Sequence, residues 1–512
     1  MRRAMAAAVV GGLVLGGVTA TSAVAAAAAT TTIRTPPATR APVSATGKKA
    51  ATKMVVYDGY EFRVPVSWPV YRLDQHPTTC VRYDVHAVYL GTPGPNMQCQ
   101  AGLIGRTQTV SVIPSTTVSA GSGPEITGQR DQPDGVGGTE LRPLPAVRAA
   151  VTINAARQEL RASLGAASLG ATVLATYGTD PGVVEQVLGT LRAAPAGAAE
   201  TAQTAPSPAL LQPSAERAPA HSGAAAVSRE SATAQPPAAK KPPAAKKNKK
   251  KARSKKPRNA VATTTSWRGV PPNWPVQIVQ QPAFQTVNGF DACTTPSLAT
   301  MRVWRQRYAA IGIYIGGVND ACAYGNLSAA WVSSAAGLGW GMLPAYVGPQ
   351  APCWQWSGPG VRIVPSRAAA EGVTAGEDAV SDARLLGLGA GSPLYYDMES
   401  YGDGPGCVNT VLTFIGAWDR TVAAAGYVTG VYASEDSGVR NMQAAATAKT
   451  AGFTAPDALW IARWDGDATL SDGPLGWPLD EQSKQYWGNT TGTVGGITLS
   501  IDDDIVGGPL AR

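Results

Sequence analysis

The C-terminal half of the chain alternates between two patterns of hydrophobic and polar residues. Eight short apolar runs have the length and composition of buried strands, at 287–291, 311–317, 341–348, 393–400, 428–434, 458–465, 484–488 and 497–505. Between most of them apolar residues recur at helical spacing, as in 296–308 and 374–388. This rhythm predicts an α/β fold, a (β/α)8 barrel of the TIM type over residues 266–512, although the segment before the seventh strand is too rich in Pro and Gly for a regular helix.

The N-terminal half carries shorter β-like runs, at 55–66, 80–90, 107–113, 149–153 and 171–177. Asp180 and Pro181 then supply the N-cap and first-turn residues of a closing helix that runs to Arg192. The pattern predicts a small α+β domain over residues 54–194, and nothing in it indicates a function.

Three stretches lack both patterns. Residues 1–29 combine Met1-Arg-Arg3, a short apolar run and the small residues Ala23-Val24-Ala25, which predicts a secretory signal peptide. Residues 30–53 and the Ala-, Pro- and Lys-rich residues 195–265 contain too little apolar surface to offset chain entropy, so we expect a disordered segment and a disordered linker. The mature protein is therefore expected to be secreted, either extracellular or associated with the cell wall.

The formal net charge of +8 comes from the linker. Between Lys240 and Arg258 there are eleven Lys or Arg and no acid, and without these eleven charges the net charge of +8 becomes −3. In an exported protein we expect no nucleic-acid partner for this run, so it either attracts an anionic wall polymer or a membrane surface or is a solvated spacer. We expect the protein to be a monomer.

The cysteines and histidines restrict the chemistry. Six cysteines in an exported chain predict disulfides: Cys80, Cys99, Cys293, Cys322, Cys353 and Cys407. The last four follow the first four predicted barrel strands in turn, which predicts the bridges Cys293–Cys322 and Cys353–Cys407 between neighbouring loops. All three histidines precede residue 222, so the barrel has no histidine-dependent nucleophile and no histidine-ligated zinc. We expect no metal and no cofactor.

Acidic residues recur where the predicted strands end. In the strand Leu394-Tyr-Tyr-Asp-Met-Glu-Ser400, the carboxyls of Asp397 and Glu399 share one face about 6.5–7 Å apart along the backbone. Two carboxyls this close do not ionise independently, and glycoside cleavage requires such a pairing of acid and anion. Asp291, Asp502 and Asp504 end or lie within the first and last strands, at the end of a barrel where active sites form. The alternative is a set of solvated acids on the surface.

Aromatic residues indicate a sugar ligand. Twelve of the thirteen tryptophans lie beyond residue 266. Four of them are near predicted strand ends or the following loops: Trp354, Trp356, Trp464 and Trp487. Flat apolar rings suit the C–H faces of pyranoses. We expect three others, Trp304, Trp331 and Trp418, to pack helices onto the barrel instead.

Eight motifs in order resemble a known family. They are Gly289-Phe-Asp-Ala-Cys293, Tyr314-Ile-Gly-Gly317, Leu343-Pro-Ala-Tyr346, Tyr395-Tyr-Asp-Met-Glu399, Gly430-Val-Tyr432, Trp460-Ile-Ala-Arg-Trp464, Gln485-Tyr486 and Ile501-Asp502. Over residues 286–506 the chain resembles the secreted bacterial glycoside-hydrolase-like domains that are related to the family 25 lysozymes. This resemblance implies a lysozyme-like TIM barrel.

The resemblance implies roles for individual residues. Glu399 corresponds to the general acid and Asp397 to the residue that orients an N-acetyl group or water, while Asp291 and Asp502 shape the charge or hold substrate. The residues that we expect to bind substrate are Tyr346, Tyr396, Trp464, Gln485 and Asp504. The leading hypothesis is a hydrolase of β-linked amino-sugar glycan of the cell wall, such as peptidoglycan. The alternatives are a non-catalytic protein that binds cell-wall polysaccharide on the same barrel, and a structural domain with no ligand.

Overall fold

A computed structural model describes residues 51–115, 140–147, 149–154, 157–164, 170–204, 285–470 and 476–512. The predicted signal peptide and the Lys-rich run lie outside these residues. From Ala51 onward the described residues belong to one compact unit. No helix within the described ranges combines the length and the apolar character that crossing a membrane requires.

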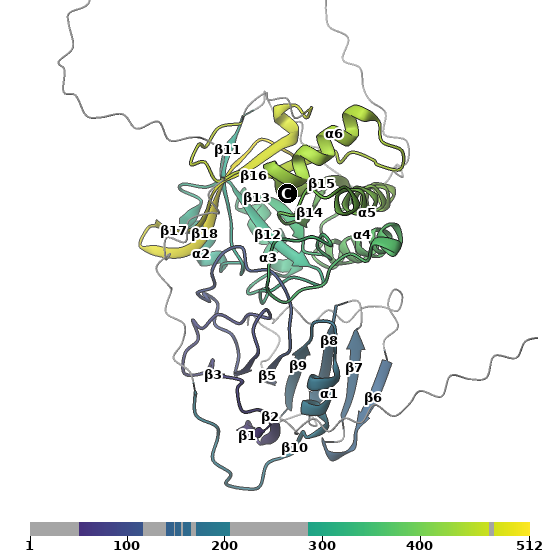
Figure 1. Cartoon of the computed structure of the whole chain (residues 1–512). Coiled ribbons are helices and arrows are strands. Elements are labelled where there is room, and N and C mark those ends of the chain that lie inside the picture. Colours follow the sequence, from purple (N-terminus) through teal and green to yellow (C-terminus); the bar gives the residue numbers. More distant parts are fainter. Residues whose placement is uncertain are drawn as a thin grey trace, which may run out of the picture. The chain divides into compact units, whose positions relative to one another are not determined.

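Eight strands of the C-terminal part close into a barrel, and each corresponds to one of the eight predicted strands (Figure 1). In chain order they are β11 (Val287–Asp291), β12 (Ala310–Gly316), β13 (Gly341–Tyr346), β14 (Pro393–Met398), β15 (Val428–Ser434), β16 (Ala458–Ala462), β17 (Gln482–Val494) and β18 (Ile497–Val506). Neighbours in the barrel are neighbours in the sequence, and β18 pairs with β11 to close it. The prediction of a closed eight-stranded barrel is confirmed.

The barrel departs from the predicted (β/α)8 barrel of the TIM type at its last strand. Strands β11 to β17 pair in parallel, whereas β18 is antiparallel to both β17 and β11. Only Gly495 and Gly496 separate β17 from β18, with φ of 56° and 79°. Two residues with positive φ form a tight hairpin turn, while a parallel crossover needs a dozen residues or more. The last connection therefore reverses the strand and contains no helix.

Between residues 285 and 470 five α-helices accompany the barrel: α2 (Leu298–Trp304), α3 (Ala329–Gly337), α4 (Ala368–Leu385), α5 (Pro405–Ala424) and α6 (Arg440–Ala448). Ser297 and Ser328 cap α2 and α3, accepting hydrogen bonds from Thr300 N at 3.2 Å and Trp331 N at 3.1 Å. The three tryptophans predicted to pack helices, at 304, 331 and 418, are all buried in the core between the helices and the barrel. This packing leaves the inner face of the strands to a different set of residues.

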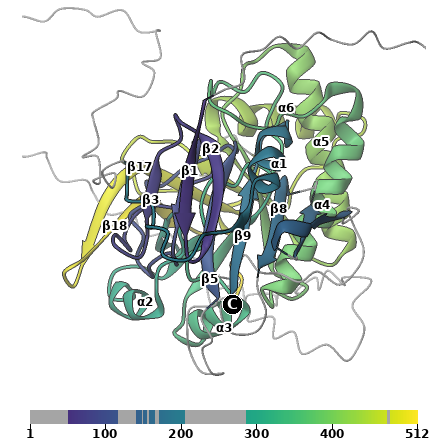
Figure 2. The ribbon, with the colours of Figure 1, turned by 90° about the horizontal axis from the view of Figure 1, so that it is seen from below.

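The described residues of the N-terminal part form two sheets. One has the order β1–β2–β10, and the other has the order β3–β4–β5–β9–β8–β7–β6. Their bounds are β1 (Thr52–Tyr57), β2 (Tyr60–Pro65), β3 (Val70–Arg72), β4 (Ala87–Leu90), β5 (Thr109–Ser115), β6 (Glu140–Leu144), β7 (Ala149–Asn154), β8 (Glu159–Leu164), β9 (Gly170–Thr176) and β10 (Arg192–Ala193). The predicted run 55–66 is a hairpin, because Asp58 and Gly59 take positive φ and turn the chain. The helix α1 (Gly182–Gly189) lies beside the strands of the N-terminal part (Figure 2), and its buried apolar residues belong to the same core as those of the sheets.

Three disulfides join the cysteines in pairs: Cys80–Cys99, Cys293–Cys322 and Cys353–Cys407. The two bridges predicted for the barrel are confirmed. Beyond β10 the chain runs along both sheets, because Thr201 N donates to Val56 O of β1 at 2.9 Å and Thr204 N donates to Val70 O of β3 at 3.0 Å.

Candidate active site

Strand β14 sends alternate side chains to opposite faces of the barrel wall. Tyr395 belongs to the cluster inside the barrel, whereas Leu394, Tyr396 and Met398 belong to the core under the helices. By the same alternation Asp397, and then Glu399 just beyond the strand, follow Tyr395 to the inside.

Three more acids reach the interior from the junction of β11 and β18. Asp291 lies directly opposite Asp502 in the antiparallel ladder, and Asp504 follows two residues later on the same face. All three are buried. Five carboxyls therefore converge in one barrel end, as the acids at the predicted strand ends indicated.

One glutamine joins the two opposed aspartates. Gln485 Nε2 donates to Asp291 Oδ2 at 2.8 Å and to Asp502 Oδ2 at 3.2 Å. Its Oε1 accepts hydrogen bonds from Tyr432 Oη at 2.9 Å and Trp464 Nε1 at 2.8 Å. The amide is thus held on both sides and fixes the carboxylates in the interior.

Two further contacts complete the network around these aspartates. Tyr314 Oη donates to Asp291 Oδ1 at 2.9 Å, so both carboxylate oxygens of Asp291 accept hydrogen bonds. Trp460 Nε1 donates to Asp504 Oδ1 at 2.9 Å.

A second glutamine, from the loop after β13, positions the end of β14. Gln350 is fully buried, and its Nε2 donates to Asp397 O at 2.7 Å while its Oε1 accepts from Glu399 N at 2.8 Å. The side chain therefore holds the backbone on both sides of Met398. Among the described residues, Asp397 Oδ1 is buried with no hydrogen-bond partner.

Burial and mutual repulsion raise the pKa values of the five acids. Burial, and then the charge of Asp291, raise the pKa of Glu399 to about 7. Burial, and then the charge of Glu399, raise the pKa of Asp397 well above its usual range. The pKa of Asp291 rises to about 6 through burial, while the hydrogen bonds from Gln485 and Tyr314 favour its charged form and oppose the rise. Near neutral pH Asp291 is then mostly ionised beside an acid that is about half protonated.

The remaining two acids, Asp502 and Asp504, have pKa values raised further than that of Asp291. Burial and then the charge of Asp291 raise the pKa of Asp502 and of Asp504 well above the usual range, although a hydrogen bond from Asn489 N favours the charged form of Asp502. Glu399 is the one member of the five that is partly exposed. It is therefore the acid that a ligand entering the barrel meets.

The expected substrate-binding residues fall into two groups. Trp464, Gln485 and Asp504 lie in the network just described, and half of the Trp464 side chain is exposed. Tyr346 and Tyr396 instead face away from the barrel interior, where their hydroxyls donate to Asp378 Oδ2 at 2.8 Å and Pro349 O at 2.6 Å. The alternation along each strand puts these two rings under the helices, so the structure gives them no access to a ligand inside the barrel.

Sequence analysis did not single out three residues of the site: Gln350, Tyr314 and Tyr432. The two tyrosines stand in the ordered motifs and at inward positions of their strands, so the alternation of each strand was a usable signal. Gln350 lies in a loop without periodicity, and its role depends on a tertiary contact across 47 and 49 residues. Across the described ranges, no group of three or more His, Cys, Asp or Glu side chains is arranged to hold a metal ion.

Residues 302–506 match the model of a protein family described as the Rv2525c-like, glycoside hydrolase-like domain. The match lies within the barrel and confirms the glycoside hydrolase-like domain that the ordered motifs predicted. Comparison with curated proteins found no match.

Three solved structures are similar to the chain over less than half of its length. An uncharacterized B. stearothermophilus protein is 19% identical, with a TM-score of 0.31, over 43% of this chain and 94% of that one. The spore cortex lytic enzyme SleM of Clostridium perfringens is 11% identical, with a TM-score of 0.30, over 43% and 67%. A family 25 glycosyl hydrolase from Bacillus anthracis is 15% identical, with a TM-score of 0.27, over 44% and 90%.

Proposed function

We propose that the glycoside hydrolase-like domain of this chain hydrolyses a β-linked amino-sugar glycan of the bacterial cell wall, such as peptidoglycan. The observation that carries the proposal is the state of Glu399. It is the partly exposed member of five inward-facing carboxyls, and its pKa of about 7 keeps a proton available at neutral pH beside the more acidic Asp291. A general acid works best when its pKa lies near the working pH.

Glu399, Asp291 and Asp397 have different roles in the proposed hydrolysis. Glu399 gives its proton to the bridging oxygen as the bond from that oxygen to the anomeric carbon breaks. The ionised Asp291 stabilises the positive charge that develops on the sugar ring. A water oxygen then bonds to the anomeric carbon, and the proton that the water loses returns to the pair formed by Asp397 and Glu399. Because Asp397 Oδ1 is unpartnered among the described residues, it is available to orient the water or an N-acetyl group.

Exposed tryptophans beside the site suit a carbohydrate. Trp356, Trp464 and Trp487 expose 46%, 51% and 55% of their surfaces, and all three follow or extend barrel strands at the end where the carboxyls lie. Trp464 also contacts the site through Gln485. Indole faces exposed beside polar groups are suited to the apolar faces of pyranoses.

The disulfides support a location outside the cytoplasm. Three bridges form among the six cysteines, and such bridges persist in oxidising compartments. We propose that the protein is secreted and that its Lys-rich linker, which lies outside the described residues, holds it near an anionic wall polymer.

Replacement of Glu399 by glutamine tests the hydrolase directly. Loss of the general acid is expected to reduce the release of reducing ends from purified cell wall about 10²- to 10⁴-fold, with thermal unfolding little changed. Glu377→Gln is the matched control, because Glu377 is an exposed glutamate on α4. Wild-type turnover in Glu399→Gln would refute the assignment.

A second candidate function is binding without cleavage. It is favoured by the Gln485 amide, which occupies oxygens of both Asp291 and Asp502 and so restrains two of the acids. Glycan binding by the wild-type protein with no turnover at any pH would establish this candidate in place of the hydrolase.

A further inference from the structure

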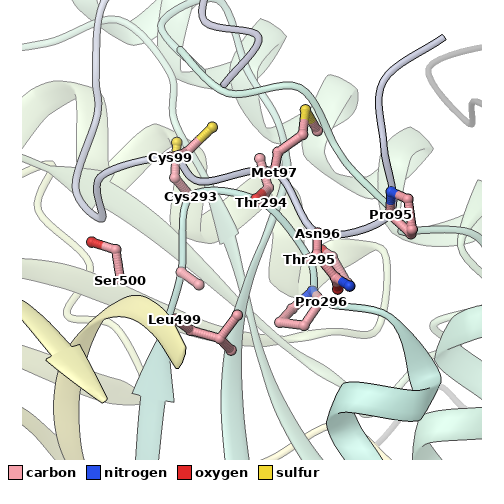
Figure 3. Close-up of a pocket in the computed structure, with 11 residues that line it drawn as sticks. Pro95, Asn96, Met97, Cys99, Cys293, Thr294, Thr295, Pro296, Leu499 and Ser500 are labelled. Atoms are coloured by element: carbon pink, nitrogen blue, oxygen red, sulfur yellow. The ribbon is translucent and has the colours of Figure 1, made fainter. Parts of the chain in front are cut away.

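Residues 95–106 of the N-terminal part, which we call the mouth segment, lie against the end of the barrel that carries the site. Pro95, Asn96, Met97 and Cys99 line a small pocket together with residues 293–296 and Leu499, as Figure 3 shows. Further along, Ile104 forms a β-bridge with Asp320, and Gly105 N donates to Asn319 O at 2.8 Å. The segment thus contacts the loops after β11 and β12 and strand β18.

The mouth segment also lies close to Asp502 and to Tyr314, the hydrogen-bond donor to Asp291. A Cβ atom at Gly102 would lie 3.5 Å from Asp502 Oδ2, although Gly102 itself is exposed. Ile104 is buried against Tyr314, Val347 and Trp354, and Tyr314 donates to Asp291. The segment is therefore part of the wall of the site, on the side of β18, β11, β12 and β13.

This wall is firmly held. The bridges Cys80–Cys99 and Cys293–Cys322 are buried in one apolar cluster that joins the two parts of the protein. The buried Arg106 guanidinium donates to Asp320 O at 3.0 Å and pairs with Glu159 at 3.1 Å. Burying such a charge is favourable only while its partners stay in place, so the contact resists opening.

The other half of the barrel mouth carries Glu399 and two of the three exposed tryptophans, whereas the third, Trp356, follows β13 on the side of the mouth segment. The partly exposed Glu399 follows β14, and the exposed Trp464 and Trp487 lie after β16 and in β17. The two indoles belong to one surface, because Trp464 lies against Gly488 and Trp487 lies against Gly466. A glycan at the barrel mouth can therefore stack on Trp464 and Trp487 on this half, while the mouth segment blocks the opposite half.

We propose that the mouth segment determines specificity by blocking one side of the barrel mouth, so that the site accepts the end of a glycan chain that enters across Trp464 and Trp487. A barrel mouth open on both sides would accept the middle of a chain. This inference rests on the proposed glycan substrate and gives the N-terminal part a role in choosing which position on the glycan is bound.

The test counts the protein molecules bound per glycan chain. The full-length Glu399→Gln protein is titrated with peptide-free glycan strands from purified cell wall, separated by length, and binding is followed by tryptophan fluorescence. If the mouth is blocked on one side, each glycan chain binds one protein molecule at every chain length. A bound number that rises with chain length would overturn the blocked side and leave the glycan substrate standing, whereas no binding at any length would overturn the proposed function itself.

A labelled cysteine tests the position of the wall independently. In the Glu399→Gln protein, Gly102→Cys places a single free thiol beside Asp502, and Gly189→Cys places one at the exposed end of α1 as the matched control. A bulky maleimide label at position 102 is expected to abolish glycan binding, and the same label at position 189 to leave it unchanged. Full binding with the label at position 102 would overturn the proposal. If Gly102→Cys does not fold, the titration decides alone.

Discussion

Asp291→Asn should flatten the pH dependence of the stability of this protein. The pKa of Asp291 rises from 3.8 to about 6 in the folded protein, mainly because the side chain is fully buried. The folded state therefore binds the proton more tightly than the unfolded state does. The stability that this contributes is complete below pH 3.8 and is lost as the pH rises through about 6.

The size of the effect follows from the shift. Each unit of pKa corresponds to about 1.4 kcal/mol, so the wild-type protein should lose about 3 kcal/mol of unfolding free energy through Asp291 between acid and neutral pH. An asparagine is neutral at every pH and can still accept from Gln485 Nε2 while its amide donates to Tyr314 Oη. The unfolding free energy of the variant should therefore lack the pH-dependent loss that Asp291 causes in the wild type. The pKa of Glu399 should be lower in the variant, because the charge of Asp291 that raises it is gone.

Urea unfolding measured at intervals from pH 4 to pH 8 compares the two proteins. The wild-type unfolding free energy should fall by about 2.4 kcal/mol more than that of Asp291→Asn over this range, because a small part of the total of about 3 kcal/mol is already lost at pH 4. In the same samples, the alkaline limb of the activity profile should move to lower pH in the variant. Parallel stability curves would show that Asp291 does not hold its proton in the folded state and would refute the charge arrangement of the site.

Three other changes have defined outcomes. Trp464→Ala removes an exposed indole, so glycan titration should show an affinity lower by about 1 kcal/mol with thermal unfolding unchanged; equal affinity would exclude Trp464 from the binding surface. Gln350→Ala leaves the buried Asp397 C=O and Glu399 N–H unpaired, so urea unfolding should show a free energy of unfolding lower by about 1–3 kcal/mol, and activity should fall as well. The control Gln306→Ala, at an exposed glutamine, should change neither. Replacing Cys353 and Cys407 together by serine should cost about 4 kcal/mol of unfolding free energy, because the bridge closes a loop of 54 residues, and an unchanged urea midpoint would contradict this.

Local patterns predicted the elements of the barrel well because each strand is short and strongly apolar. All eight strands appear close to their predicted positions, and the two barrel bridges join the cysteines that follow adjacent strands. The direction of β18 was not predicted, because a run of apolar residues has the same pattern in either direction. Gly495-Gly496 was the local signal, since two adjacent glycines favour a hairpin over a crossover.

The candidate site was predicted in part for a similar reason. Residue spacing places Asp397 and Glu399 on one face of a strand, but spacing alone does not say which face is inside. Tyr396 shows the difference: it is one residue from Asp397 and packs under the helices. The partners Gln350 and Gln485 depend on contacts between segments far apart in the chain, which periodicity does not encode.

Three properties could be predicted from the order of the amino acids alone: which segments become strands and helices, which cysteines lie on neighbouring loops, and that acids gather where the barrel strands end. These properties depend on interactions within a few residues and on the order of the elements. Three others became clear only from the folded structure: Gln485 links Asp291 to Asp502, burial raises the pKa of Glu399 to about 7, and residues 95–106 form one wall of the site. The physical reason is that desolvation and long-range hydrogen bonding act between residues brought together by folding, at separations that no local pattern records.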